Sequence, residues 1–189
     1  MRINEIFYSL QGEGHFTGTA AIFVRFSGCN LRCPFCDTEH ETFREMTPEE
    51  ILMETKRYPA RHIVLTGGEP SIQITPDLID LLHRENYFIQ VETNGTFPLP
   101  ENIDWITCSP KSLPLALDRV DELKVVYTGD SSIVEKYSSA VEAGERRLQP
   151  CDTGDAARNA SLLEETIGYI KNHPRWRLSL QTHKLLRIP

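Results

Sequence analysis

Short blocks of apolar residues recur along the chain, and most have the length and composition of β-strands. Strands are predicted at residues 3–10, 21–27, 62–65, 88–92, 105–108, 122–127 and 177–181, with a weaker candidate at 147–149. Helix-like stretches fill intervals between them at 51–58, 78–85, 131–143 and 155–172. Strands that alternate with helices pair in parallel through crossover connections, so the pattern predicts an α/β protein.

Two of the predicted helices carry clear start signals. Thr47, Pro48 and Glu50 supply an N-cap, a first-turn proline and a capping-box glutamate before 51–58. Thr75 and Pro76 play the same parts before 78–85. We also expect the helix at 155–172 to end before a proline and the helix at 131–143 to stop at a glycine.

Chain length decides between the two common parallel architectures. An eight-unit barrel typically takes ~250 residues, and this chain has 189. We therefore expect an incomplete, TIM-like β/α barrel of about six βα units, forming one domain over residues 1–189 because no linker interrupts it. Clusters of unusual residues follow the predicted strands at 28–36, 66–70, 93–95 and 109–111. Ligands gather at the carboxyl ends of parallel strands, so these clusters predict one shared site.

Charge and hydropathy exclude several classes of protein. The formal charge of −7 and the scattered basic residues argue against nucleic-acid binding. No stretch approaches the ~20 apolar residues that cross a bilayer. The first residues alternate like a strand and lack the apolar run of a secretion signal, so we expect a cytoplasmic protein acting on a small molecule.

Three of the five cysteines lie close together, at Cys29, Cys33 and Cys36. A loop with three thiolates can ligate three irons of a [4Fe–4S] cluster and leave the fourth open to another ligand. A zinc site with His40 as fourth ligand is an alternative, and a disulfide is a weaker one. The remaining two, Cys108 and Cys151, are expected to be small buried residues.

The Cys-x3-Cys-x2-Cys spacing after an early strand, with Phe35 before the last cysteine, resembles the radical S-adenosylmethionine (SAM) superfamily. The resemblance extends to the segment Thr66-Gly-Gly-Glu-Pro70, which matches the stretch that binds the SAM amino group in that superfamily. It implies a radical SAM core in which the cluster and SAM, rather than a protein side chain, carry the chemistry.

Further segments resemble one family within the superfamily. Six of them follow in order: 9–14 (SLQGEG), 23–32 (FVRFSGCNLR), 36–38 (CDT), 91–95 (VETNG), 109–111 (SPK) and 179–184 (SLQTHK). Together they are similar to 7-carboxy-7-deazaguanine synthases of queuosine and deazapurine biosynthesis. That resemblance implies conversion of 6-carboxy-5,6,7,8-tetrahydropterin to 7-carboxy-7-deazaguanine with loss of ammonia. It also implies dependence on Mg²⁺, an electron donor such as flavodoxin or ferredoxin, and a homodimer.

The resemblance assigns a role to each motif residue. Expected substrate contacts are Gln11, Gly12, Glu13, Arg25, Thr66, Gly68, His183 and Pro189, the last through a free C-terminal carboxylate. Expected SAM contacts are Phe35, Gly67, Gly68, Glu69, Thr93, Asn94, Ser109 and Lys111. Thr38 is the expected Mg²⁺ ligand, with Asp37 as the alternative. The guanidinium of Arg25 suits a carboxylate, although a surface salt bridge would use the same group.

Two other functions compete with this interpretation. A glycyl-radical-enzyme activating enzyme would share the cysteine triplet and the small size, but it would not need the 11–14 segment or the Mg²⁺-binding threonine. A zinc-stabilised binding module without catalysis belongs to a different class altogether. Absorption from an iron–sulfur cluster would discriminate against the binding module.

Overall fold

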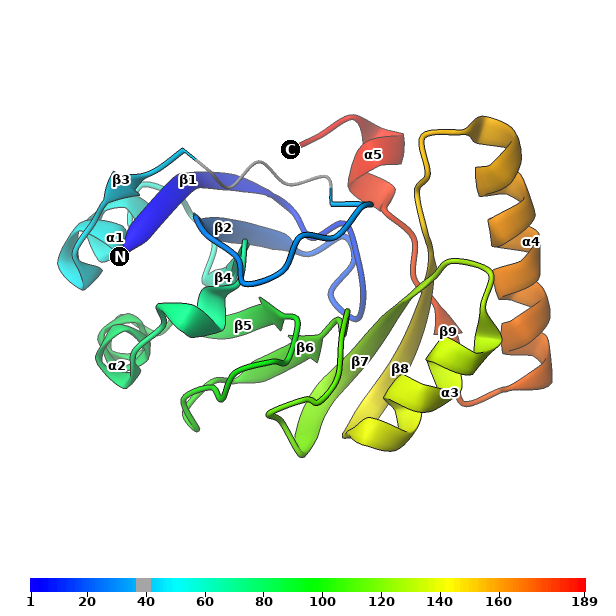
Figure 1. Cartoon of the computed structure of the whole chain (residues 1–189). Coiled ribbons are helices and arrows are strands. Elements are labelled where there is room, and N and C mark those ends of the chain that lie inside the picture. The colour runs from blue at the N-terminus through cyan, green and yellow to red at the C-terminus, as the bar shows by residue number, and fades with distance from the viewer. Residues whose placement is uncertain (37–41) are drawn as a thin grey trace.

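The computed structural model describes residues 1–36 and 42–189 and contains one nine-stranded sheet (Figure 1). The strands are β1 (Arg2–Leu10), β2 (Ala20–Phe26), β3 (Arg44–Glu45), β4 (His62–Gly67), β5 (Phe88–Thr93), β6 (Trp105–Cys108), β7 (Arg119–Tyr127), β8 (Glu142–Pro150) and β9 (Arg177–Leu178). The α-helices are α1 (Pro48–Thr55), α2 (Pro76–Arg84), α3 (Ser131–Ala140), α4 (Ala156–Asn172) and α5 (Thr182–Leu186), and a 3₁₀ turn spans Pro70–Ile72.

Strand order identifies the architecture. From β2 onward the neighbouring strands are parallel and follow chain order, β2-β4-β5-β6-β7-β8-β9, apart from the short β3, which pairs with β1. Crossovers that always step in the same direction keep their helices on one face, which curves the sheet as in a barrel. A doubly wound sheet would reverse direction at its centre. The predicted α/β class and incomplete barrel are therefore confirmed.

The connections vary more than a regular barrel requires. Four of the six parallel steps contain an α-helix, whereas the fully described connections 94–104 and 109–118 contain none. The link between β1 and β2, residues 11–19, is too short for a crossover, so these two strands pair antiparallel. This hairpin lies between β3 and β4 in the sheet, and its connecting loop brings the 11–14 segment to the pocket.

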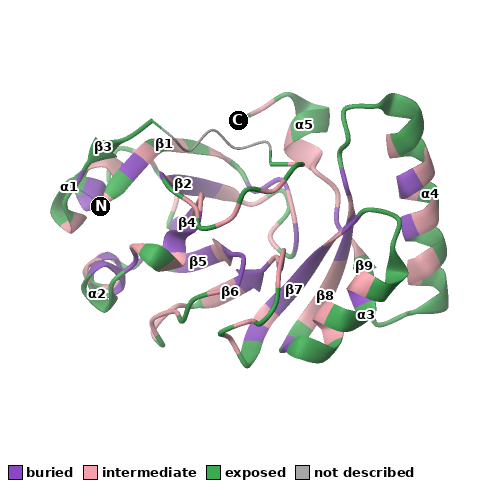
Figure 2. Cartoon of the chain, in the orientation of Figure 1, coloured by how far each residue is buried: buried purple, intermediate pink, exposed green. Residues whose placement is uncertain are grey.

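Alternation along the strands separates two environments. The outward side chains of β2, β4 and β5 pack under α1 and α2, while those of β7 and β8 pack under α3 and α4. The purple bands along the strands in Figure 2 mark this burial. The inward face is apolar at β2 and β4, where Phe7 stacks on Phe23 with ring centroids 5.0 Å apart. On β5 and β7 it is polar and buried, with Gln90, Glu122 and Lys124.

The helix start signals are confirmed in atomic detail. The Thr47 hydroxyl accepts a hydrogen bond from the Glu50 amide at 3.2 Å, and the Glu50 carboxylate accepts one from the Thr47 amide at 2.8 Å. At α2, the Thr75 hydroxyl accepts from the Leu78 amide at 3.4 Å. At both sites, the capping residues next to the helix are sufficient to predict where it begins.

Other boundaries depart from the prediction. Helix α3 ends at Ala140 rather than 143, and Gly144 lies inside β8 instead of stopping a helix. Strand β8 pairs with β7 along its whole length, so sheet pairing overrides helix propensity there. The predicted strand 177–181 is only the two residues of β9, and the short β3 and α5 were not predicted.

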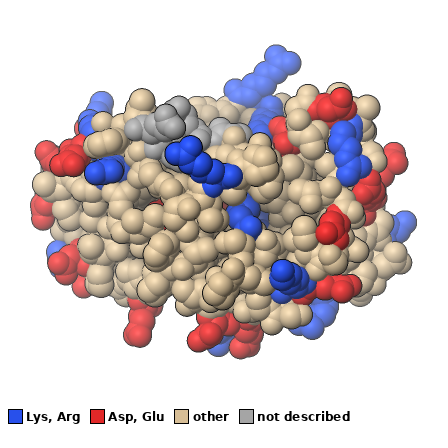
Figure 3. Space-filling view, in the orientation of Figure 1, with Lys and Arg blue, Asp and Glu red and all other residues tan. Residues whose placement is uncertain are grey.

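The surface carries both signs of charge. Figure 3 shows acidic and basic side chains interspersed around the rim of one face, with a largely uncharged area between them. None of the described helices has both the length and the apolar character needed to span a membrane.

Candidate active site

A pocket of about 510 Å³ opens at the carboxyl ends of the parallel strands. Every predicted site residue that the structure describes lines it, although these residues come from segments spread between positions 11 and 189. The remaining prediction, Thr38, lies outside the described residues, as do its alternative Asp37 and the zinc candidate His40. The structure thus brings the predicted residues together, while their individual ligand roles stay predictions.

The cysteine loop forms one wall of the pocket directly after β2. Cys29, Cys33 and Cys36 all line it, and none of the three forms a disulfide with another described cysteine. Burial raises the pKa of Cys29 and of Cys33. Among the described residues, no three His, Cys, Asp or Glu converge on a common metal-ion position. A cubane cluster does not need that convergence, because each thiolate binds a different iron, and three thiols on one short loop suit such a cluster.

The glycine pair after β4 packs directly on the cysteine loop. The Gly68 amide donates to the Phe26 carbonyl and the Glu69 amide donates to the Gly28 carbonyl, each at 2.9 Å. A Cβ on Gly68 would collide with the carbonyl group of Gly28. Glycine is required at position 68 because two backbones meet there.

Glu69 is almost fully buried and held from the next strand. Its Oε1 accepts a hydrogen bond from Thr93 Oγ1 at 2.6 Å, and its Oε2 accepts one from the Asn94 amide at 2.7 Å. Asn94 in turn donates from Nδ2 to Oδ1 of Asn30 in the cysteine loop at 3.1 Å. Thr93 and Asn94 therefore position the carboxylate and connect it to the cluster loop.

The segment after β6 adds polar groups to the pocket wall beside the cysteine loop. The Ser109 hydroxyl is buried and has no hydrogen-bond partner among the described residues. Lys111 donates to the Ser109 carbonyl at 3.0 Å and lies 5.9 Å from the centre of the Phe35 ring. Burial, with repulsion from Lys124, lowers the pKa of Lys111. A buried hydroxyl without a partner is costly, so this wall suits a ligand with polar groups, as SAM has.

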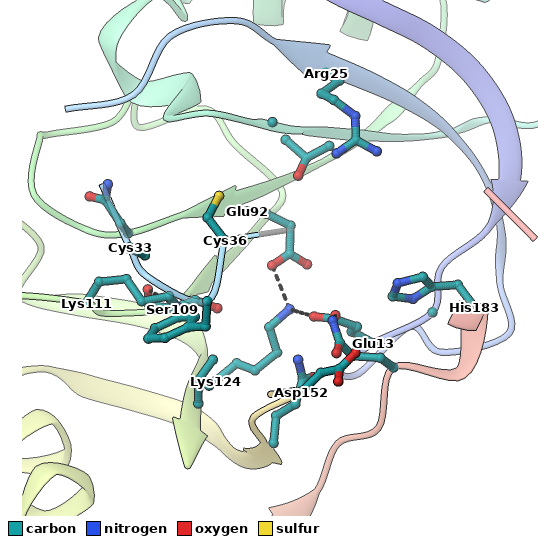
Figure 4. A pocket seen from close by; sticks show the side chains of 18 of the residues that line it. Glu13, Arg25, Cys33, Cys36, Glu92, Ser109, Lys111, Lys124, Asp152 and His183 are labelled. Carbon is teal, nitrogen blue, oxygen red and sulfur yellow. Dashed lines mark hydrogen bonds and ion pairs between the residues drawn. The ribbon is translucent and has the colours of Figure 1, made fainter. Parts of the chain in front are cut away.

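Three charged side chains form the floor of the pocket, as Figure 4 shows with dashed lines. Lys124 Nζ lies 2.7 Å from Glu13 Oε2 and 2.9 Å from Glu92 Oε2. Burial would raise the pKa of Glu13, but the Lys124 ammonium outweighs it and brings that pKa to about 2. Burial raises the pKa of Glu92 to about 7 despite Lys124, because Glu122 and Glu13 repel its charge.

Glu92 and Lys124 were not among the predicted site residues. A signal for Lys124 existed in the sequence: Glu122 and Lys124 occupy alternate positions in an otherwise apolar strand, which places both on one face. Glu92 immediately precedes the predicted Thr93 and Asn94 and lines the same pocket. The alternation of charged and apolar residues along this strand could have predicted a charged inner face. The ion pair between Lys124 and Glu13 could be recognised only in the folded structure.

Arg25 forms the salt bridge considered for it and also lines the pocket, while its role as a carboxylate ligand stays a prediction. Its Nε donates to Glu5 Oε1 at 2.7 Å, and its guanidinium lies 5.5 Å from the centre of the Phe7 ring. It also lines the pocket and is directed toward it (Figure 4). The salt bridge between Arg25 on β2 and Glu5 on β1 therefore orients the guanidinium at the pocket wall.

The C-terminal segment covers the 11–14 loop. The amide and hydroxyl of Thr182 both donate to the Gly12 carbonyl, each at 2.9 Å. His183 packs so closely on Gly12 that a side chain there would collide with its ring. Ser9 Oγ also donates to the main-chain oxygen of Pro189 at 2.8 Å. These contacts bring His183 and Pro189 to the pocket.

Comparisons with known proteins agree with this site. Residues 23–136 match the Radical SAM superfamily. The 7-carboxy-7-deazaguanine synthase of Bacteroides thetaiotaomicron is 54% identical over 99% of this chain and 98% of its own length. The enzyme of the same name from Neisseria meningitidis is 43% identical over 97% of this chain and 92% of its own length.

The fold has a solved counterpart. The crystal structure of QueE from Escherichia coli superposes with a TM-score of 0.77 at 31% identity, covering 95% of this chain and 92% of that one. These likenesses favour the 7-carboxy-7-deazaguanine synthase interpretation over the activating-enzyme and zinc-module alternatives. The chain belongs to the 7-carboxy-7-deazaguanine synthase family of radical SAM enzymes.

Proposed function

We propose that this protein converts 6-carboxy-5,6,7,8-tetrahydropterin to 7-carboxy-7-deazaguanine with loss of ammonia, in queuosine or deazapurine biosynthesis. The observation that carries the proposal is the composition of one pocket. Its cysteine wall suits an iron–sulfur cluster, and its floor presents carboxylates that suit a nitrogen-rich heterocycle. The relatives named for this reaction match the whole chain.

On the cofactor side, Cys29, Cys33 and Cys36 would hold the [4Fe–4S] cluster. Glu69, fixed by Thr93 and by the amide of Asn94, would accept hydrogen bonds from the SAM amino group. When bound, the cluster and SAM supply a 5′-deoxyadenosyl radical that removes a hydrogen atom from the substrate. Further proposed SAM contacts, all of which line the pocket, are Phe35, Gly67, Gly68, Ser109 and Lys111.

On the substrate side, the protein binds and orients the pterin. Its pyrimidine edge offers N–H donors, and the Glu13 and Glu92 carboxylates are acceptors already held by Lys124. Arg25 would bind the substrate carboxylate through its planar guanidinium. Thr66, Gly68, His183 and Pro189 complete the proposed contacts, together with Gln11 and Gly12.

The surroundings of the pocket are proposed to keep water out. The C-terminal segment is tied to Gly12 through Thr182 and to Ser9 through Pro189, and His183 and Pro189 line the pocket there. Exclusion of water protects a radical from side reactions and strengthens hydrogen bonds to the substrate.

Several further proposals rest on resemblance to the family. Thr38 would bind Mg²⁺ together with the substrate carboxylate, in keeping with the preference of Mg²⁺ for oxygen. Flavodoxin or ferredoxin would supply the electron, and the enzyme would work as a cytoplasmic homodimer of single-domain chains spanning 1–189. Chelation followed by stepwise return of Mg²⁺ tests the first of these through recovery of product.

The test of the main proposal is a strictly anaerobic assay of iron-reconstituted protein with SAM, dithionite, Mg²⁺ and 6-carboxytetrahydropterin. Mass spectrometry should detect 7-carboxy-7-deazaguanine only when every component is present. Cys33→Ala should abolish both product and SAM cleavage, while Lys56→Met, on the surface, should change neither. SAM cleavage without product would refute the substrate, and neither reaction from a cluster-loaded protein would refute the enzyme class.

A further inference from the structure

The polar floor of the pocket contains one cation and more than one anion. Lys124 is only 4% exposed, and its ammonium contacts Glu13 and Glu92 simultaneously. Both carboxylates line the pocket and come from different parts of the chain, the β1–β2 loop and β5. A single positive charge is therefore shared between two acids that face the same ligand.

The two acids have different surroundings. Glu13 Oε1 accepts a further hydrogen bond from Gln181 Nε2 at 3.0 Å. Glu92 Oε1 accepts from the neutral amides of Gln90, at 3.0 Å, and Gln11, at 3.4 Å. These bonds fix the position of both carboxylates without adding a second cation to either.

A third acid lies below them. Glu122 is fully buried on β7, two residues before Lys124 and on the same face of the strand. Its Oε2 accepts from the His15 amide at 3.0 Å, and its Oε1 has no partner among the described residues. The charges of Glu122 and Glu13 both act on Glu92, whereas Lys124 is its one close cation among the described residues.

We propose that Lys124 is a positioning residue whose single ammonium pairs with both carboxylates. In this arrangement Glu13 stays ionised, and Glu92 is the carboxylate that exchanges a proton when the ligand binds. The geometry carries this assignment: Glu13 forms the shorter ion pair, at 2.7 Å against 2.9 Å, and accepts a further bond from Gln181, whereas Glu92 shares Lys124 with Glu13 and is repelled by Glu13 and Glu122. Other titratable groups act on this cluster: Lys111 repels Lys124, His183 acts on Glu13, and the buried Cys108 thiol interacts with Glu92. The inference rests on the proposed function for the identity of the ligand, but not for the ionisation itself.

A consequence for substrate binding follows. N–H donors of a pterin bind an ionised carboxylate more strongly than a protonated one. As pH falls through the pKa of Glu92, about 7, a proton competes with the ligand. KM for the substrate should then rise, approaching tenfold per pH unit as the limit for one linked proton.

The direct test is a titration of side-chain carboxyl carbons by ¹³C NMR, in reconstituted holoenzyme labelled at glutamate. Glu92→Gln identifies the Glu92 signal by its disappearance. Lys124→Met should move the Glu92 titration upward by about one to three pH units, because an opposite charge is lost. Glu13→Gln should move it downward, because a like charge is lost and Lys124 is no longer shared.

A nonspecific disturbance of the structure would not shift the Glu92 titration in opposite directions in the two variants, so the signs of the shifts test the charges themselves. Lys56→Met, which removes a surface lysine paired with Glu85 at 2.9 Å, is the matched control and should leave the titration unchanged. If Lys124→Met does not fold, the downward shift in Glu13→Gln decides alone. Shifts of the same sign, or no shift in Glu13→Gln, would overturn the proposal.

The KM profile separates this inference from the proposed function. In the wild type, the midpoint of the pH dependence of KM should coincide with the midpoint of the Glu92 titration. In Lys124→Met and Glu13→Gln, both midpoints should shift by the same amount. A KM independent of pH from 6 to 8 would overturn the link to binding. If the wild type made no 7-carboxy-7-deazaguanine, the proposed substrate would fall, and the NMR titration, which needs no substrate, would still decide the role of Lys124.

Discussion

Replacing Gly68 with alanine tests the contact between the two loops that form the cofactor side of the pocket. The new Cβ would lie 2.5 Å from the carbonyl carbon of Gly28 and 3.2 Å from the Cys29 amide nitrogen. Ordinary contacts between carbon atoms begin near 3.5 Å, so the loops must separate by about 1 Å. Both obstacles are backbone atoms, which cannot rotate away as a side chain can.

The energetic cost follows from the bonds at this crossing. Separation breaks or stretches two backbone hydrogen bonds, from the Gly68 amide to Phe26 and from the Glu69 amide to Gly28, each 2.9 Å long. At a net value of about 1 kcal/mol each, the variant should lose about 1–3 kcal/mol of unfolding free energy. The larger effect should be functional, because a misplacement of about 1 Å can cost ~100-fold in rate.

The assay compares wild type, Gly68→Ala and Gly168→Ala after identical iron reconstitution. Urea unfolding measures stability, visible absorption measures cluster content, and anaerobic SAM cleavage measures rate. Gly168 lies in α4 with open space at its Cβ position, so alanine there should stabilise by about 0.5–1 kcal/mol and leave cleavage unchanged. Normal SAM cleavage and stability in Gly68→Ala would refute the close packing of the two loops.

Three further predictions address stability and ligand binding. Because the Glu92 pKa is raised from 4.5 to about 7, the native carboxyl keeps a proton that the unfolded chain releases, so wild-type stability should fall as pH rises across that window. The free energy of unfolding of Glu92→Gln, measured with urea, should rise by roughly 3 kcal/mol relative to that of the wild type between pH 4.5 and 7. A difference between the two proteins that does not change with pH would contradict the raised pKa. Ser109→Ala removes a buried hydroxyl without a partner, so stability should not fall, while SAM affinity by equilibrium dialysis should drop about 3–10-fold; unchanged affinity would remove Ser109 from the SAM site. Ile89→Ala, at a fully buried position on β5, should cost about 2–5 kcal/mol by cavity formation, and a loss below 1 kcal/mol would show that the core collapses around it.

Much of the fold could be predicted because its signals are local. The starts of α1 and α2 follow from capping residues adjacent to each helix, and alternation of apolar residues located most strands. The end of α3 and the start of β8 could not be predicted this way. Residues 141–143 have no strong preference of their own, and pairing with β7 decides that they form a strand.

The sequence by itself determined the cofactor side of this protein. The spacing of Cys29, Cys33 and Cys36 and the glycine pair before Glu69 place several chemical groups within a few residues, so chain connectivity alone keeps them together. Only the tertiary structure decided the floor of the pocket. Lys124 bonds to Glu13 and Glu92 across separations of 111 and 32 residues, and no short-range pattern specifies such a pairing. The attraction between these groups is strong in the low dielectric of the buried floor, and that environment exists only once the sheet has formed.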